Sequence, residues 1–193
     1  MIWKRALTDQ ENEICRRLGE IVIVWNHVEQ SFRILLHRAT HIAGPDGRLW
    51  SLIAHLTPIQ LAASMAALSH DHQDERRGHL AHCAKVFDRE REYRNYYVHA
   101  PRTFWSTDTM SHLIASSLSA RGGSLVLRQS QIEAEELSAY LERLSVLQTY
   151  IGELLEDSHN LRNGKPLSEL SKPTVAPAVP AEKSDWWERT RAQ

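Results

Sequence analysis

Three residues near the middle of the chain have side chains suited to work on a phosphodiester. They are Arg94, Asn95 and His99, within the stretch REYRNYYVHA. A guanidinium can stabilise charge on nonbridging phosphate oxygens, and an imidazole, which titrates near neutral pH, can move a proton to or from a ribose 2′-hydroxyl or a leaving oxygen. Such a reaction needs no metal ion, because the RNA supplies its own nucleophile. Its product is a 2′,3′-cyclic phosphate.

The helix that carries these residues decides whether they can meet. A charged stretch with apolar residues on one side predicts a helix over about residues 73–98, and Pro101 ends it close to His99. At ~100° per residue, Arg94 falls on the apolar side, while Asn95 and His99 share a face at its edge, with His99 ~140° from Arg94. Arg94 and His99 therefore converge only if the last turn loosens or the arginine side chain curls across.

A guanidinium on an apolar face needs a partner, because taking an unpaired charge out of water costs several kcal/mol. The predicted first helix, residues 8–41, offers Glu29, which lies in its apolar stripe between Trp25 and Phe32. We expect Glu29 to approach Arg94 inside the fold and to support the site. The open alternative is that Glu29 leans to the edge of its stripe and stays hydrated.

Apolar periodicity predicts an all-α fold, a bundle of four to five helices. The first helix opens with a capping box at Thr8 and Glu11, and the last core helix with one at Ser130 and Glu133. A break at Thr57-Pro58 allows two shorter helices or one kinked helix between residues 49 and 70. The last helix should end before Asn163-Gly164.

One segment departs from the helical pattern. Residues 102–128 contain short β-type runs and the glycine pair Gly122-Gly123. We expect a small β-hairpin inserted before the last core helix.

Length and composition predict one domain, residues 1–163, followed by a proline- and alanine-rich tail, residues 164–193, that is expected to be flexible. The chain has 193 residues and is 42% hydrophobic, which suits one soluble domain. Its net charge of −1 provides no global field for nucleic acid or anionic membranes, so such a partner must bind a local patch. The tail contains Trp186-Trp187, flanked by charged residues. The pair is either a docking peptide for a partner or a chance occurrence.

Several classes of site and location are not expected. No stretch has a signal peptide's apolar core or the length of a membrane span, and two cysteines cannot form a disulfide framework, so a cytoplasmic protein is expected. His79 and Cys83 have the spacing of a helical metal pair, but no third ligand is placed by spacing. We therefore expect neither a metal nor another cofactor.

Arg94 and His99 together resemble the R-x4-H motif of the HEPN superfamily, with the polar Asn95 directly after the arginine as is frequent there. The layout is similar too, with a long first helix, the motif at the end of a later helix and a closing helix. The resemblance covers roughly residues 8–160. Ala100-Pro101 follows the histidine where toxins paired with a minimal nucleotidyltransferase antitoxin tend to carry a tyrosine, so the resemblance does not specify the antitoxin.

The resemblance implies a helical bundle that forms a homodimer and sets two motifs in one cleft. It also implies a metal-independent endoribonuclease of toxin–antitoxin, phage-defence or RNA-processing systems, with an antitoxin or other protein as a further partner. Arg94 and His99 would be the catalytic pair and Asn95 their polar support. Other members of the superfamily are catalytically silent and bind nucleotides or proteins, and this alternative stays open.

RNA contacts beyond the motif are expected from exposed aromatic and basic side chains. Tyr96 points away from the apolar side and could stack on a base. Arg91 and Arg102 could line a groove for the RNA backbone. The competing explanation for the motif itself is a buried ion pair with a helix C-cap, in which His99 lies at the negative end of its helix.

Overall fold

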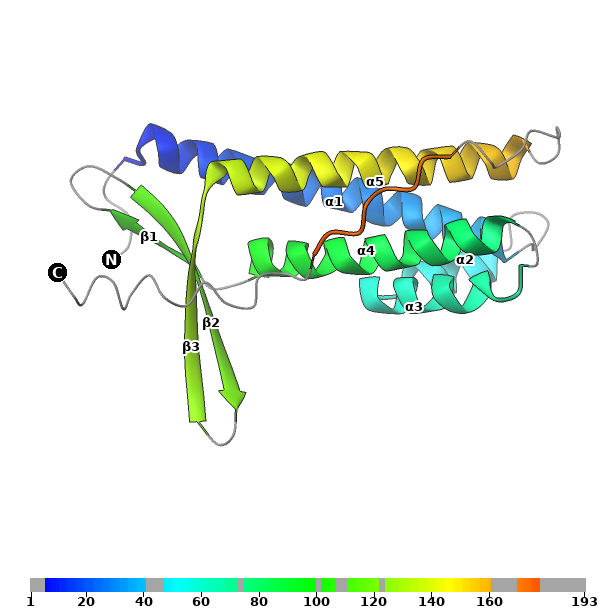
Figure 1. The fold of residues 1–193 in the computed structure, drawn as a ribbon, viewed down its shortest axis with the longest axis horizontal. Helices are drawn as coiled ribbons and strands as arrows, with labels where there is room; N and C mark the ends of the chain where they lie inside the picture. Colours follow the sequence, from blue (N-terminus) through cyan, green and yellow to red (C-terminus); the bar gives the residue numbers. More distant parts are fainter. Residues whose placement is uncertain are drawn as a thin grey trace. The chain divides into compact units, whose positions relative to one another are not determined.

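The part of the chain that the structure describes is predominantly helical and forms five helices and one small sheet (Figure 1). The computed structural model describes residues 6–40, 47–72, 75–99, 102–106, 111–121, 124–160 and 170–177; for residues 157–160 and for the strands apart from Ile114, Gln131 and Ile132 it describes the backbone alone. The elements are α1 (Asp9–Ala39), α2 (Gly47–Ala54), α3 (Pro58–Ser69), α4 (Glu75–His99), β1 (Arg102–Ser106), β2 (Ser111–Arg121), β3 (Ser124–Ile132) and α5 (Ala134–Asn160).

The first helix begins as predicted. The Thr8 backbone amide donates to Glu11 Oε2 (2.8 Å) and the Glu11 amide donates to Thr8 Oγ1 (3.2 Å), so the capping box is confirmed. The helix ends at Ala39, two residues before the predicted end. Its buried side chains recur at helical spacing: Ile14, Ile21, Trp25, Val28, Phe32, Leu35 and Leu36.

The segment around Thr57-Pro58 forms two helices, α2 and α3, rather than one kinked helix. The Thr57 amide and hydroxyl both lie within hydrogen-bond distance of Gln60 Oε1, at 2.8 and 2.9 Å. Pro58 occupies the first helical position, where its missing N–H costs nothing. Cap and proline together explain why α3 starts here.

The insertion before α5 is larger than the predicted hairpin. It is a three-stranded antiparallel sheet in the order β1-β2-β3. β2 pairs with β3 from Leu113↔Ile132 to Arg121↔Ser124, and β1 adds the pairs from Arg102↔Ala115 to Ser106↔Ser111. The predicted turn at Gly122-Gly123 lies outside the described residues.

The predicted start of the last helix is wrong. Ser130 belongs to β3, which continues to Ile132, and α5 begins at Ala134. Pairing of β3 with β2 therefore overrides the local capping signal. The helix ends at Asn160, before Asn163 as expected.

The chain divides into two compact units. α1, α4 and α5 each contribute to both of them. Unit 1 comprises Met1–Val22, Tyr93–Leu141 and Ala178–Gln193, and unit 2 comprises Ile23–Glu92 and Glu142–Pro177. The predicted domain boundary at residue 163 stays a prediction.

The core of unit 2 is built on an aromatic stack. The ring of Phe87 on α4 stacks on Phe32 and on Trp25, with centroid distances of 4.0 and 5.1 Å. All three side chains are buried, and burying aromatic rings in this way is a large hydrophobic contribution. This stack joins α1 to α4 within the unit.

Part of the predicted tail packs in unit 2. Residues 170–177 form an irregular segment, drawn in orange in Figure 1. His82 Nε2 lies 2.7 Å from the carbonyl oxygen of Pro173, and Ala176 is buried. This stretch is therefore held to α4 rather than free in solution.

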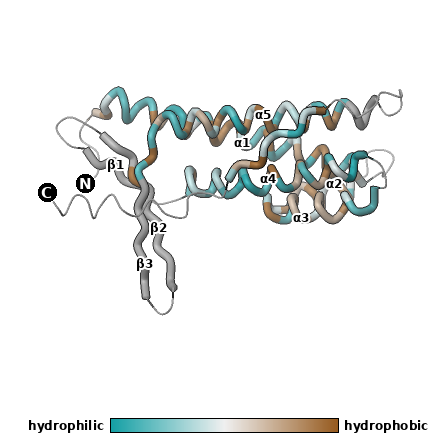
Figure 2. Tube along the Cα trace, viewed as in Figure 1, coloured by the Kyte–Doolittle hydropathy of each residue, from teal (hydrophilic) through white to brown (hydrophobic). Residues whose placement is uncertain are grey.

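Hydropathy alternates along the long helices, as expected of helices that bury one face (Figure 2). Across the described segments, no helix has both the length and the apolar character that a membrane span requires. α3 differs from the long helices, since brown and white predominate on it in Figure 2.

Candidate active site

The predicted motif lies at the C-terminal end of α4, within unit 1. Arg94 is half-buried, whereas Asn95 and His99 are exposed. Arg94 Nη1 is hydrogen-bonded to His99 Nε2 and lies 3.3 Å from Asn95 Oδ1. α4 stays helical to His99, so the arginine reaches the imidazole by curling along the helix and not by loosening of the last turn.

The chemistry of the donor fixes the state of the imidazole in this arrangement. A guanidinium can only donate hydrogen bonds, so Nε2 of His99 must be the acceptor. The ring is then neutral and carries its proton on Nδ1. Arg94 Nη1 donates one hydrogen bond to His99 and one to Asn95, and both acceptors are neutral. The guanidinium keeps its full positive charge next to an imidazole lone pair.

The Nε of Arg94 is buried, and the described residues provide it with no hydrogen-bond partner. An unpaired buried donor costs about 1–3 kcal/mol. Such groups in folded proteins often mark a place where a ligand, ion or water completes the bonding. Nε and Nη2 form the edge of the guanidinium that binds carboxylate or phosphate in bidentate fashion.

Tyrosines on either side of Arg94 hold this end of α4 in place. Tyr93 and Tyr97 are buried, and both rings pack against Tyr140 on α5, with centroid distances of 6.0 and 5.2 Å. Tyr96 is half-buried and meets the ring of Tyr97 edge-on at 5.1 Å. The backbone that carries the motif is thereby anchored to the start of α5.

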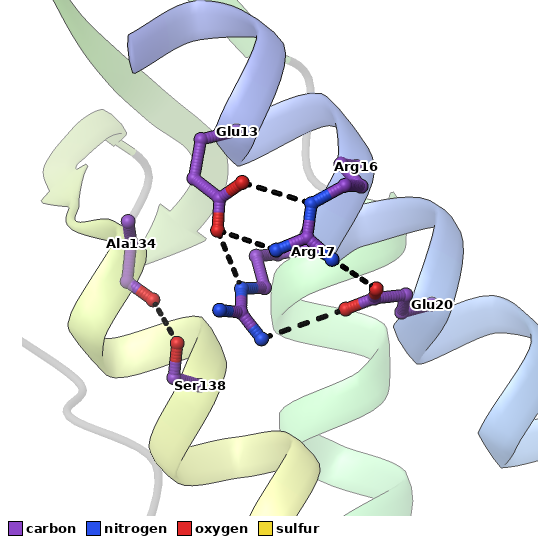
Figure 3. Close-up of polar contacts among 6 residues, drawn as sticks. All are labelled: Glu13, Arg16, Arg17, Glu20, Ala134 and Ser138. Carbon is purple, nitrogen blue, oxygen red and sulfur yellow. Dashed lines mark hydrogen bonds and ion pairs between the residues drawn. The ribbon is translucent and has the colours of Figure 1, made fainter.

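The other arginines described in unit 1 have carboxylate partners. Figure 3 shows Arg16 and Arg17 on α1 between Glu13 and Glu20. Arg17 Nε lies 2.8 Å from Glu13 Oε1, and the hydrogen bond from Arg16 leads the interactions that lower the pKa of Glu13 to about 2. These guanidinium charges are compensated by adjacent carboxylates, unlike the contacts that Arg94 makes with Asn95 and His99.

Glu29 has partners on its own helix, in unit 2. Trp25 Nε1 donates to Glu29 Oε2 (2.9 Å), and Arg33 Nη2 lies 2.5 Å from Glu29 Oε1. The Glu29 and Arg33 side chains are 17% and 16% exposed, so this carboxylate is partly buried and compensated one helical turn away on each side. The predicted approach of Glu29 to Arg94 stays a prediction.

The two further basic residues are placed unequally. Arg91, in unit 2, is half-buried and donates from Nε to Asp88 Oδ1 at 2.7 Å, an i,i+3 pair on α4. Arg102 opens β1 in unit 1, and its side chain lies outside the described set. Their predicted contacts with RNA stay predictions.

The histidine-rich region before the motif is structural in character. No three histidine, cysteine, aspartate or glutamate side chains in the described ranges are grouped to hold a metal ion. Cys83 is buried, and burial raises the pKa of its thiol, so it stays protonated. The buried and half-buried histidines lie within hydrogen-bond distance of neutral oxygens: His72 Nε2 of Ala39 O (3.2 Å), His79 Nδ1 of Tyr150 Oη (2.8 Å) and His82 Nε2 of Pro173 O (2.7 Å).

One buried charge was missed at the sequence level. Glu90 on α4 is 1% exposed and accepts from Arg143 Nε of α5 at 3.1 and 3.3 Å, within unit 2. Burial raises its pKa, and the nearby Arg143 opposes that shift. Glu90 follows Val86 and Phe87 by four and three residues and so falls on their buried side.

No protein-family model, curated protein or solved structure matches this chain. What bears on function is therefore the geometry of the motif and its R-x4-H pattern.

Proposed function

We propose that this protein is a metal-independent endoribonuclease of HEPN type that leaves a 2′,3′-cyclic phosphate. The observation that carries the proposal is the contact between Arg94 and His99, in which a charged guanidinium is bonded, among the described residues, only to neutral groups and lies beside an exposed imidazole. A positive charge that can bind the phosphate and a base that can deprotonate the 2′-hydroxyl are thus adjacent.

The first step is binding of the scissile phosphate. Its nonbridging oxygens pair with the Nη2 and Nε edge of Arg94, which fills the unmet bonding of Nε. Moving toward the anion draws Nη1 away from His99 Nε2. Substrate binding therefore frees the lone pair that the resting site keeps occupied, and Asn95 steadies the guanidinium through its side-chain oxygen.

The second step is an in-line displacement. His99 Nε2 takes the proton of the 2′-hydroxyl, the 2′ oxygen attacks phosphorus, and the bond from phosphorus to the 5′ oxygen breaks. Arg94 stabilises the charge that builds on the nonbridging oxygens. The leaving 5′ oxygen takes a proton from solvent and the protonated His99 returns its own proton to solvent, so the products are a cyclic phosphate and a 5′-hydroxyl.

Neighbouring residues extend the site in this proposal. Tyr96 stacks on a base next to the cleaved bond, while Arg91 and Arg102 contact the RNA backbone. A homodimer with two motifs in one cleft, and a role as a toxin or phage-defence protein held in check by an antitoxin, follow from the HEPN resemblance and belong to the same proposal.

The test compares wild type with Arg94→Ala and His99→Ala on labelled RNA in EDTA. Both variants should lose ~10²–10⁴-fold in cleavage rate while keeping the wild-type melting temperature. His55→Ala, an exposed histidine of unit 2, is the matched control and should cut normally. Cleaved RNA should carry cyclic-phosphate ends, and a 2′-deoxy substitution at the cut site should block cleavage. Wild-type protein that leaves RNA intact, or His99→Ala that still cuts, would overturn the proposal.

The second candidate is a silent module that binds a nucleotide. It is favoured by the resting contact itself, since His99 Nε2, in the last turn of α4, is already occupied by Arg94. In this case Arg94→Ala abolishes nucleotide binding in calorimetry, His99→Ala preserves it, and neither variant has an activity to lose.

A further inference from the structure

Residues 170–177 lie along one face of α4 in unit 2, in a region where the sequence predicted a flexible tail (Figure 1). Lys172 lies beside Gly78, since a Cβ atom added to Gly78 would be 3.4 Å from Lys172 Nζ. The carbonyl oxygen of Pro173 lies 2.7 Å from His82 Nε2. Gly78 and His82 are one helical turn apart, so consecutive residues of the segment meet consecutive turns of one helix face. We define residues 170–177 as the strap.

The hydrogen-bond donor on α4 is oriented by residues of the helices themselves. A carbonyl oxygen only accepts hydrogen bonds, so His82 Nε2 is the donor to the strap. The His82 ring stands edge-on to the ring of Tyr150 on α5, with centroids 6.2 Å apart. Tyr150 is buried, and its hydroxyl lies 2.8 Å from His79 Nδ1. Core contacts between α4 and α5 therefore hold the imidazole that meets the strap.

The strap is a peptide that its own prolines hold extended. Pro173 and Pro177 fix their φ angles at ~−65°, and each biases the residue before it towards extended backbone. Such a peptide loses little conformational freedom when it docks, and grooves with aromatic side chains exploit this in recognising proline-containing segments. Ala176, three residues after Pro173, is buried. A larger side chain at that position would have to displace its neighbours.

We propose that this part of unit 2 is a binding site for extended, proline-containing peptides, and that the strap closes the site as an internal ligand. The contacts define the ligand class. The peptide offers a backbone carbonyl to His82 Nε2, a proline at that residue keeps it extended, and a small side chain follows three residues later. Lys172, the one charged residue of the strap, is exposed, so recognition depends on neutral groups.

The strap is held lightly enough to be exchanged. Of its eight described residues Ala176 alone is buried, so little apolar surface holds it compared with a core helix. The strap succeeds because it is tethered. α5 ends at Asn160, and a ligand joined by so short a connection has an effective concentration on the order of millimolar. A peptide from another protein therefore enters the site when it binds more tightly than the strap or when the strap is released.

The first experiment measures binding of a separate peptide to the full chain. In Ala176→Asp a charge replaces the buried methyl group, so the variant's own strap should leave the site. A fluorescent peptide with the sequence of residues 168–179 should bind this variant, and it should bind wild type ~10-fold or more weakly because the strap competes. Thr174→Asp places the same charge at an exposed strap position and should behave as wild type. A peptide that itself carries Ala176→Asp should bind neither chain.

The second experiment locates the peptide at His82. In the Ala176→Asp chain, His82→Phe keeps a ring but removes the donor, and it should weaken peptide binding ~2–10-fold. His82→Gln retains an N–H donor and should keep most of the affinity. Circular dichroism shows whether each variant is folded, and Ala176→Gln, which is oversized but uncharged, replaces Ala176→Asp if that chain does not fold. A peptide that binds wild type and the strap variant equally, binds neither, or binds the His82→Phe chain undiminished would overturn the proposal.

Discussion

His79 and His99 lie on the same helix, one in each unit, and their surroundings are opposite. His79 is buried and shares a 2.8 Å contact with the hydroxyl of Tyr150, a neutral group whose pKa burial raises. His99 is exposed, and its contact is with the cationic Arg94. The buried pair is complete within the protein. The exposed pair joins a cation to a base, and the contacts described for the two side chains include no carboxylate.

The difference separates a histidine held against a neutral oxygen from one placed beside a cation. His79 has the spacing of a helical metal pair with Cys83, yet each described buried imidazole in this region lies against a neutral oxygen. His99 lies 20 residues further along the chain, is exposed and has a cationic partner. Exposure and the charge of the partner decide the matter, and local density of histidines does not.

The largest expected effect comes from a substitution that keeps the positive charge of Arg94 but removes its planar guanidinium with several N–H donors. Arg94→Lys preserves a cation but cannot donate to Asn95 while pairing two phosphate oxygens in bidentate fashion. We expect cleavage to fall by ~10²–10³-fold, close to the effect of losing a preorganised donor. Single-turnover rates on labelled RNA measure it. Near wild-type rates would mean that point charge suffices and that the fork geometry is irrelevant.

The buried pair should respond in stability and not in activity. His79→Ala leaves the buried Tyr150 hydroxyl without its imidazole partner, which costs about 1–3 kcal/mol in free energy of unfolding. Urea denaturation measures the loss. The double variant with Tyr150→Phe should recover part of it, because neither partner is then left unpaired. A change in RNA cleavage comparable to that of Arg94→Lys would break the comparison.

The buried carboxyl group of Glu90 should make the free energy of unfolding depend on pH. Its folded-state pKa is raised by burial, so the folded protein holds this proton more tightly than the unfolded chain does. The free energy of unfolding should therefore fall as pH rises from the ordinary value of 4.5 through the raised pKa. Glu90→Gln should flatten this part of the dependence of the unfolding free energy on pH. Denaturation measured from about pH 4 to about pH 8 checks this. An unchanged slope would contradict a buried, titrating carboxylate.

The smallest effect is expected at the exposed ion pairs of unit 1. The pKa of Glu13 is lowered to about 2, so its contribution is present above the ordinary value of 4.5 and is lost as pH falls through about 2. Glu13→Gln should reduce acid sensitivity slightly, and added salt should mimic the variant in wild type. Thermal melting at low and neutral pH checks this. A salt-independent loss would point to packing instead.

Local rules predicted the helices well where one signal dominated. The Thr8–Glu11 box and Thr57-Pro58 marked helix starts because the hydrogen bonds involved are made within four residues. Ser130 carried an equally good local signal and was misleading, since β3 is defined by its pairing with β2 and not by its own sequence. The same limit applied to Glu90, whose burial depends on Arg143, 53 residues away.

The sequence predicted which residues make up the candidate site, but it predicted only part of their arrangement. Residue types and the end of the helix placed Arg94 near His99, but ideal helical angles left them ~140° apart. The contact exists because the arginine side chain is long enough to follow the helix axis. The anchoring of this end of α4 by Tyr140 was not foreseen, because it joins segments 43 or more residues apart, from Tyr97 to Tyr140.

Each compact unit is assembled from stretches that are distant in the chain, and this sets the order of events during synthesis. Unit 1 needs Met1–Val22 together with Tyr93–Leu141, and unit 2 needs Ile23–Glu92 together with Glu142–Pro177. The nascent chain cannot finish either unit before α5 has left the ribosome, although chains usually fold domain by domain from the N-terminus. The segment that carries Arg94 therefore leaves the ribosome well before the α5 residues that pack against it. The surroundings of Arg94 and His99 are complete only after those residues have been synthesised.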